Sequence, residues 1–123
     1  MYKQEGYNIV GAAIEVYNTL GHGFLEEVYQ ECLEIELKLR DIPFHSHPKL
    51  ILSYKSKQLE KYYIPDLYLY DGIVVELKAV KQLSEEHFAQ IMNYLRVTEK
   101  PVGYLLNFGC TEKLEWKRII MNH

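Results

Sequence analysis

The sequence predicts an α/β fold in which two N-terminal helices precede a mixed central β-sheet flanked by helices. Three patterns support this fold class: apolar residues recur at helical spacing up to residue 39, strand-like apolar runs begin at residue 44, and a helical segment separates two strands within residues 73–108. A chain of 123 residues suffices for one domain that buries roughly two thirds of its unfolded surface. We therefore expect residues 1–123 to form a single domain.

Composition and charge exclude several classes of protein. Hydrophobic residues make up 48% and charged residues 25%, as in soluble globular proteins, and no apolar run approaches the ~18 residues of a membrane span. The N-terminal residues lack the basic-then-apolar pattern of a signal peptide. Cys32 and Cys110 have no metal-type spacing, so we expect reduced thiols in a cytoplasmic protein. The net charge of -3 argues against binding nucleic acid through overall charge, but it is compatible with acidic metal ligands and a local basic stripe.

Two amphipathic helices are predicted at the N-terminus. The first runs from about residue 7 to residue 20, and Gly21-His22-Gly23 ends it because glycine accepts the left-handed backbone of a helix end. The second carries an apolar stripe from Leu25 to Leu39 and ends at Asp41-Ile42-Pro43. Since both helices have one apolar face, we expect them to pack as a pair.

Strand-like segments follow from Phe44 onward. Pro48 separates residues 44–47 from residues 50–54, and a lysine-rich turn leads into a predicted strand over residues 59–70. A β-hairpin continues to Ala79. Its second strand is followed by a helix, which starts the last part of the chain.

The last part of the chain predicts a parallel crossover. A helix begins after Ser84, a residue typical of helix N-caps, and ends at Lys100-Pro101. Residues 102–108 form a continuous apolar run, as in a strand buried on both faces, and residues 114–121 form a final strand. Strand, helix and strand across residues 73–108 favour a right-handed parallel connection.

The pairing register of the hairpin decides which side chains share a face. Its sequence from Tyr62 to Lys81 is YYIPDLYLYDGIVVELKAVK. A two-residue loop, Asp71-Gly72, would leave both faces mixed in polarity, whereas a three-residue loop, Tyr70-Asp71-Gly72 with Gly72 left-handed, would separate them. The separated faces are Leu67, Leu69, Ile73, Val75 and Leu77 on one side, and Asp66, Tyr68, Val74, Glu76 and Lys78 on the other. Because hydrophobic patterning sets register where one face is buried, we predict the three-residue loop.

The polar face of this hairpin has the residues for metal-assisted chemistry. Asp66 would lie directly opposite Glu76, and two carboxylates about 5 Å apart are destabilising unless a positive charge lies between them. Oxygen ligands without clustered His or Cys favour Mg²⁺ or Mn²⁺. Such an ion with Lys78 beside it would suit phosphodiester hydrolysis. The alternative is that Lys78 only pairs with Glu76 or Asp66 on a partly exposed surface.

Several motifs together carry a resemblance to a known family. Pro65-Asp66 and, nine residues later, Glu76-Leu77-Lys78 resemble the PD-(D/E)XK nuclease motif, and Gln90 with Tyr94 is similar to the Q-x-x-x-Y element of some members. GFLEEVY, from Gly23 to Tyr29, resembles the motif of the GxxExxY protein family, a branch of that superfamily. Leu106 to Gly109 and Lys117 to Ile119 also resemble that family.

The resemblance implies a restriction-endonuclease-like core and roles for individual residues. Asp66, Glu76 and the backbone carbonyl of Leu77 would ligate Mg²⁺ or Mn²⁺, and Lys78 would be the catalytic lysine. Glu26 would join the metal site directly or through water, or would only complement the N-terminus of its helix. Gln90 and Tyr94 would contact the nucleic-acid backbone or steady the site, with simple packing as the alternative for Tyr94.

The resemblance leaves more than one function open. The leading hypothesis is metal-dependent phosphodiester hydrolysis of nucleic acid, with DNA as the expected substrate. The alternative is a catalytically inactive module on a nuclease-like scaffold that binds nucleic acid or protein. A third is a structure-selective junction nuclease that acts as a dimer, and a homodimer or a protein partner would then supply specificity.

Two further patterns receive structural interpretations. Lys49, Lys55, Lys57 and Lys61 form a basic cluster, which we interpret as protection of a strand edge against aggregation in preference to a DNA footprint. His45-Ser46-His47 would place both imidazoles on one strand face, but two further zinc ligands are missing from the sequence pattern.

Overall fold

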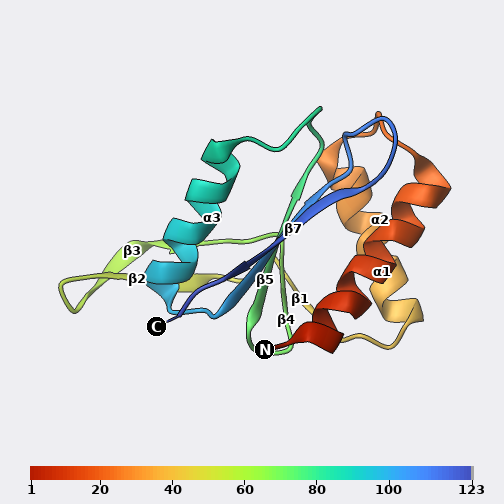
Figure 1. The fold of residues 1–123 in the computed structure, drawn as a ribbon. Coiled ribbons are helices and arrows are strands. Elements are labelled where there is room, and N and C mark those ends of the chain that lie inside the picture. Colours follow the sequence, from red (N-terminus) through yellow and green to blue (C-terminus); the bar gives the residue numbers. More distant parts are fainter. Residues whose placement is uncertain (123) are drawn as a thin grey trace.

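A five-stranded sheet separates two helices from a third in the computed structural model of this chain (Figure 1). The structure describes residues 1–122, so the last residue of the predicted domain lies outside the described residues. In chain order the elements are α1 (Lys3–Leu20), α2 (Glu26–Leu39), β1 (His45–Ser46), β2 (Leu50–Tyr54), β3 (Lys57–Tyr63), β4 (Leu67–Leu69), β5 (Ile73–Lys78), α3 (Glu85–Thr98), β6 (Val102–Asn107) and β7 (Glu115–Ile120). This architecture confirms the predicted α/β fold class.

The sheet is mixed, as predicted. Its strand order is β1-β4-β5-β6-β7, in which β5 and β6 are parallel and the other neighbours are antiparallel. The parallel pair is joined through α3, which confirms the predicted crossover across residues 73–108. Every residue of β6 is buried, as expected for a strand covered on both faces.

Each face of the sheet has its own apolar layer. On one face, α1 and α2 pack against the aliphatic side of the β4–β5 hairpin, which consists of Leu67, Leu69, Ile73, Val75 and Leu77. On the other face, Ile91 and Leu95 of α3 pack against Val74 and Leu105. The hairpin therefore directs alternate residues into two different layers, as its sequence pattern predicts.

The predicted register of this hairpin is confirmed. Leu69 pairs with Ile73, Tyr68 with Val74 and Leu67 with Val75, so three residues connect the two strands. The predicted left-handed Gly72 is wrong, because Tyr70 and Asp71 hold the positive φ angles, both 55°, and the N–H of Gly72 donates to the Leu69 carbonyl.

Gly72 has a different reason to be glycine. A Cβ atom added there would lie 2.5 Å from the hydroxyl oxygen of Tyr2, so the glycine admits the ring of the N-terminal segment. Tertiary contact, rather than backbone conformation, thus accounts for the residue type at this position.

Two predicted element boundaries are wrong. The predicted strand over residues 59–70 is two strands, since β3 pairs only with β2 in a separate two-stranded sheet and β4 enters the main sheet. Pro65 explains the break, because it lacks an N–H and disfavours regular structure at Ile64 before it. Helix α1 begins at Lys3 rather than near residue 7, and its buried Gly6 leaves room for the ring of Tyr104.

The helices are too short or too polar to span a membrane in the part of the chain that the structure describes. Within residues 1–122, none combines the length and the apolar character needed to cross a bilayer.

Candidate active site

The β4–β5 hairpin holds Asp66 and Glu76 against each other. Asp66 precedes β4 by one residue, and Glu76 lies within β5. The backbone N–H of Asp66 donates to Glu76 Oε1 at 3.3 Å, and the backbone N–H of Leu77 donates to Asp66 Oδ2 at 2.7 Å. Each carboxylate is thus fixed by the other strand's backbone, so the pair sits where the three-residue loop predicts.

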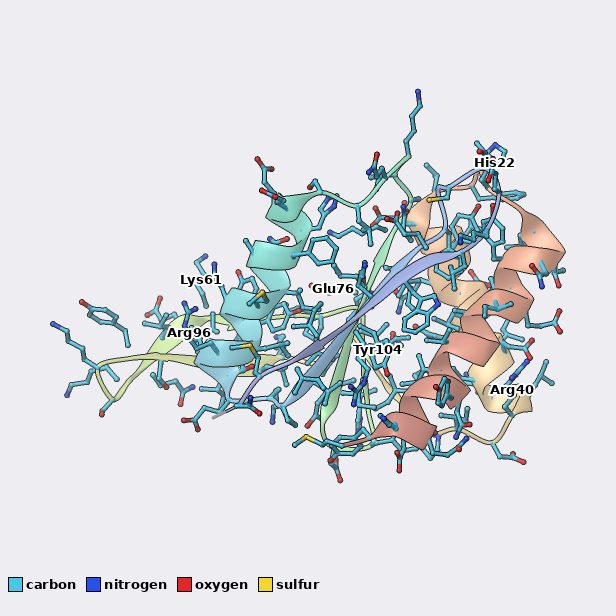
Figure 2. The ribbon with its side chains drawn as sticks, viewed as in Figure 1. His22, Arg40, Lys61, Glu76, Arg96 and Tyr104 are labelled. Carbon is cyan, nitrogen blue, oxygen red and sulfur yellow. The ribbon has the colours of Figure 1, made fainter. Side chains whose placement is uncertain are left out.

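Glu76 lies in the layer between β5 and α3, near the middle of the molecule (Figure 2). The hydroxyl of Tyr63 donates to Glu76 Oε2 at 2.8 Å, and the ring of Tyr63 stacks on that of Tyr94 with centroids 4.0 Å apart and planes 4° apart. Burial, and then the charge of Asp66, raises the pKa of Glu76 from 4.5 to about 7. Burial and the nearby Glu76 also raise the pKa of Tyr63, which keeps its hydroxyl a donor.

The raised pKa predicts that the metal-free protein loses stability as pH rises from 4.5 to about 7. The folded-state pKa lies above the unfolded value, so its contribution is fully present below 4.5 and lost as pH rises through about 7. The loss amounts to up to about 3 kcal/mol in the free energy of unfolding. Urea denaturation in EDTA at a series of pH values measures it.

Glu76→Gln is the control for this prediction, because glutamine cannot lose a proton but keeps nearly the same shape. The variant should show no fall in stability across this pH window beyond that caused by the other titrating groups. An equal fall in wild type and variant would assign the effect elsewhere.

Asp66 opens on a cavity of about 280 Å³ beside the start of α2. Its walls are Glu26, Glu27, Gln30, His47, Asp66 and Leu77. Glu26, the first residue of α2, therefore faces the same space as Asp66, although Glu76 is not among the lining residues. The Gln30 amide donates to the backbone carbonyl of Asp66 at 2.9 Å, which ties α2 to the hairpin.

The start of α2 is held by Tyr29, the last residue of the GFLEEVY segment. Tyr29 is fully buried, and its ring stacks on Phe108 with centroids 4.6 Å apart. Its hydroxyl donates to the Gly21 carbonyl at 2.5 Å and accepts from the Phe24 N–H at 3.3 Å. Tyr29 thus anchors the loop before α2 and thereby positions Glu26.

His47 is a site neighbour that the sequence did not indicate. Its Nε2 lies 3.5 Å from Asp66 Oδ1, and its backbone N–H donates to the Asp66 carbonyl at 3.1 Å. The predicted strand over residues 44–47 is only His45–Ser46, and His47 has a φ of 48°, so the two imidazoles do not share one strand face. The spacing of histidines carries no signal for this contact, because tertiary packing creates it.

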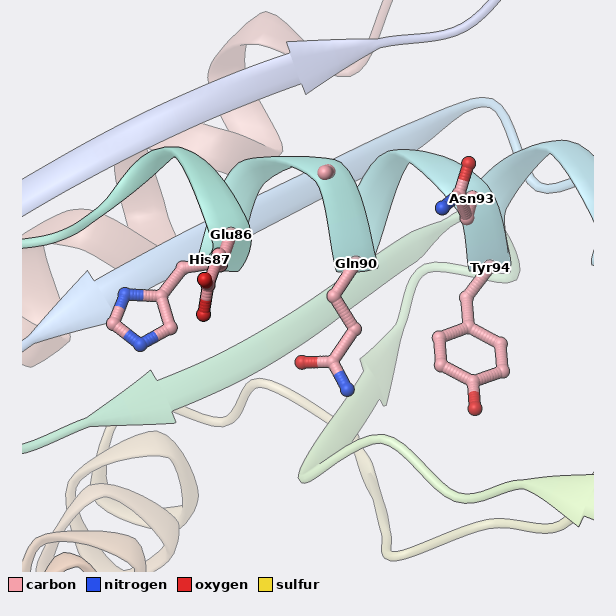
Figure 3. Close-up of a pocket in the computed structure, with 6 residues that line it drawn as sticks. Glu86, His87, Gln90, Asn93 and Tyr94 are labelled. Atoms are coloured by element: carbon pink, nitrogen blue, oxygen red, sulfur yellow. The ribbon is translucent and has the colours of Figure 1, made fainter.

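Helix α3 presents two further predicted residues, Gln90 and Tyr94. His87, Gln90 and Tyr94 project on one side of the helix and Asn93 on another (Figure 3). With Glu86 and Ala89 they line a cavity of about 600 Å³. Tyr94 reaches Glu76 only through Tyr63, whereas His87 accepts a hydrogen bond from the Ser84 N–H at 3.0 Å and so caps the helix.

A model described as the PD-(D/E)XK nuclease superfamily matches residues 3–119. The chain belongs to this superfamily. The match includes Pro65-Asp66 and Glu76-Leu77-Lys78, whose assignment to the superfamily motif stays a prediction.

The crystal structure of SSO0001 has a similar fold. The two superpose with a TM-score of 0.63 at 15% sequence identity, over 99% of this chain and 61% of that one. The PD-(D/E)XK chain thus spans about three fifths of that protein, and the likeness shows the fold alone. No curated protein matches the sequence.

Lys78 is the predicted lysine of the motif. It ends β5 on the same alternating side as Glu76 and is partly exposed. The ion pairs formed by residues 1–122 are Arg40–Glu36 and His47–Asp66, so the described structure does not pair Lys78 with either carboxylate. The Lys78 carbonyl accepts the Phe108 N–H at 2.8 Å, which holds the end of β5 against β6.

The oxygen atoms of Asp66, Glu76 and Leu77 are the candidate ligands for a divalent metal ion. Within residues 1–122, no group of three or more His, Cys, Asp or Glu residues is arranged to hold one. Two carboxylates and a backbone carbonyl, however, suit Mg²⁺, which keeps several water ligands. The charge of Asp66 raises the pKa of Glu76, and a cation between them would relieve that repulsion. The residues present therefore fit Mg²⁺ or Mn²⁺.

A buried amide fixes the segment that follows Lys78. Asn107 is fully buried, and its Oδ1 accepts the N–H groups of Val80 at 2.9 Å and Gly109 at 3.0 Å. Its Nδ2 donates to the Val80 carbonyl and to Glu115 Oε1, both at 2.9 Å. This network joins the segment after β5 to β6 and β7, two residues beyond Lys78.

Proposed function

We propose that this PD-(D/E)XK protein is a Mg²⁺- or Mn²⁺-dependent nuclease that hydrolyses phosphodiester bonds of DNA. The observation that carries the proposal is the reciprocal bonding of Asp66 and Glu76 to each other's strand backbone. It fixes two acidic side chains that have no apolar packing role and that gain from a shared cation. Superfamily membership supports the same chemistry.

Each proposed catalytic residue has one role. Asp66, Glu76 and the Leu77 carbonyl hold the metal ion, and Glu26 joins them across the cavity, directly or through water. When bound, the ion polarises a phosphate oxygen and lowers the pKa of a water molecule. Lys78 stabilises the negative charge that develops on the phosphate as the bond breaks.

The face of α3 serves the substrate in this proposal. Gln90 is exposed and lines the larger cavity, so its amide contacts a phosphate or sugar of the nucleic-acid backbone. Tyr94 has two tasks, since its ring both lines that cavity and supports Tyr63 against Glu76.

The proposal assigns the chain to the GxxExxY branch of the superfamily. Gly23, Glu26 and Tyr29 have distinct places that suit such a motif. Gly23 adopts a φ of 109°, which favours glycine, while Tyr29 anchors the preceding loop and Glu26 faces the Asp66 cavity.

A second candidate function comes from a different class. The described residues show no three-ligand metal group, and the chain carries a net charge of -3. The first observation favours a catalytically inactive module that binds nucleic acid or protein on the same scaffold, and the acidic charge predicts weak autonomous DNA binding. Metal binding separates the two functions, because only the nuclease requires it.

The test uses purified protein with linear, nicked and single-stranded DNA in Mg²⁺, Mn²⁺ or EDTA. We expect cleavage with either metal and none in EDTA. Titration of Mn²⁺ into the protein by calorimetry should show binding at one site. Absence of both cleavage and Mn²⁺ binding would support the inactive module.

A further inference from the structure

The β2–β3 hairpin projects from the body of the protein (Figure 1). We call residues 49–63 the arm. Leu50, Leu52 and Tyr63 pack at its base against the layer under α3, whereas residues 57–62 are all exposed. Most of the arm therefore adds no buried core, and folding stability does not explain its length.

The arm concentrates positive charge in an acidic protein. It carries four lysines and one glutamate, a net charge of +3, whereas the remaining residues carry ten Lys or Arg and sixteen Asp or Glu, a net charge of -6. None of the four arm lysines belongs to an ion pair within residues 1–122. The arm lysines therefore form a positively charged patch that no ion pair neutralises within residues 1–122. Such a patch attracts phosphate groups.

Tyrosine rings support two of these lysines. Lys49 Nζ lies 5.6 Å from the centroid of the Tyr62 ring, and Lys55 Nζ lies 5.4 Å from that of Tyr54. A ring face attracts an ammonium group without neutralising it. The ring contacts restrict where these two lysines can lie. Protection of a strand edge against aggregation would not require such fixed positions.

The arm leads directly into the candidate site. Its last residue, Tyr63, donates to Glu76, and Asp66 follows three residues later. At about 3.3 Å per residue, the tip near Lys57 lies roughly 20 Å from Tyr63, which is about six base pairs of duplex. Lys61 lies away from the central sheet that holds Glu76 (Figure 2).

We propose that the arm binds duplex DNA beside the bond that is cut, with Lys55 and Lys57 on backbone phosphates. The proposal rests on the proposed nuclease function, and it names the form of substrate. A two-stranded ribbon fits the major groove, which is about 12 Å wide. Because the arm is positively charged, we favour duplex DNA over an apolar protein surface as its binding partner, although Ile51 and Tyr54 are also exposed.

The test compares two double variants that each remove two positive charges. Lys55→Gln with Lys57→Gln changes the tip, and Lys113→Gln with Lys117→Gln changes two exposed lysines on and before β7. Binding to a fluorescent duplex is measured by anisotropy in Ca²⁺ over a range of salt concentrations. We expect the tip variant to bind about tenfold or more weakly and to lose roughly 1.8 from the salt slope.

The control variant should bind nearly as wild type does. Equal loss in both variants, or no loss in the tip variant, would overturn the arm as the binding element. A tip variant that changes the oligomeric state in light scattering, with DNA affinity unchanged, would identify a protein interface and also overturn it.

The two proposals fail separately. If wild type and the tip variant bind duplex equally while Asp66→Asn abolishes cleavage, the nuclease stands and the arm does not. If no metal-dependent cleavage occurs but the tip lysines still govern duplex binding, the nuclease fails and the charge contact remains.

Discussion

Replacing Asp66 with asparagine will abolish Mn²⁺ binding and slow DNA cleavage by at least about 10²–10³-fold. Asparagine keeps the oxygen that accepts the Leu77 N–H, so the hairpin stays intact, but it removes the charge that would hold the ion. Lys78→Gln should slow cleavage by a similar factor while Mn²⁺ still binds. Single-turnover cleavage and calorimetric titration measure the two effects.

Asp71→Asn is the matched control. Asp71 is exposed at the far end of the same hairpin, and its φ of 55° suits asparagine. This variant should cleave DNA as fast as wild type. Cleavage by Asp66→Asn at the control rate would contradict the assignment of Asp66 as a metal ligand.

Replacing Asn107 with alanine will lower the free energy of unfolding by about 3–5 kcal/mol. The substitution leaves the half-buried N–H groups of Val80 and Gly109 without this acceptor. It also removes the donor that the buried amide gives to Glu115. Urea denaturation followed by the fluorescence of Trp116 measures the change.

Asn18→Ala makes the same chemical change at an exposed position near the end of α1. We expect less than about 0.5 kcal/mol from it, because it removes no buried partner. Equal effects from the two variants would show that the Asn107 network adds nothing to stability.

The hairpin could be predicted from the sequence because its information is local. Alternation with a period of two sorts Leu67 and Val75 from Glu76 and Lys78, and a shift by one residue would bury the charges. The parallel crossover followed in the same way from the order of strand and helix patterns. Neither prediction required knowledge of distant residues.

The errors arose where a distant segment decides the structure. Gly72 looked like a left-handed turn residue, yet it is glycine because Tyr2 packs over it. His47 reaches Asp66 only because β1 joins the edge of the sheet beside β4. Asn107 likewise showed no sign in the sequence of the five hydrogen bonds that its side chain makes.

Metal binding and the catalytic roles of Asp66, Glu76, Lys78, Glu26, Gln90 and Tyr94 stay predictions. The hydrogen bonds between Asp66, Glu76 and the opposite strands support the metal site. Superfamily membership supports nuclease chemistry in general. Glu26 lines the cavity of Asp66, whereas Gln90 and Tyr94 line a separate one on α3. The sequence pattern alone did not distinguish these two neighbourhoods.

Strand β5 lies in the middle of the five-stranded sheet, whereas the arm belongs to a separate two-stranded sheet. We expect the hydrogen bonds of the two sheets to open independently of each other. All six residues of β5 pair with β6, and β4 pairs with Ile73, Val74 and Val75 on its other edge, so we expect the β5 amides to exchange with solvent more slowly than those of the arm. Within residues 1–122 the β2–β3 pair has no third strand, so we expect its tip to open more readily. We therefore expect Glu76 to stay fixed while the tip of the neighbouring arm opens and re-forms, which would let a charged ribbon adjust to its contacts without disturbing the carboxylates.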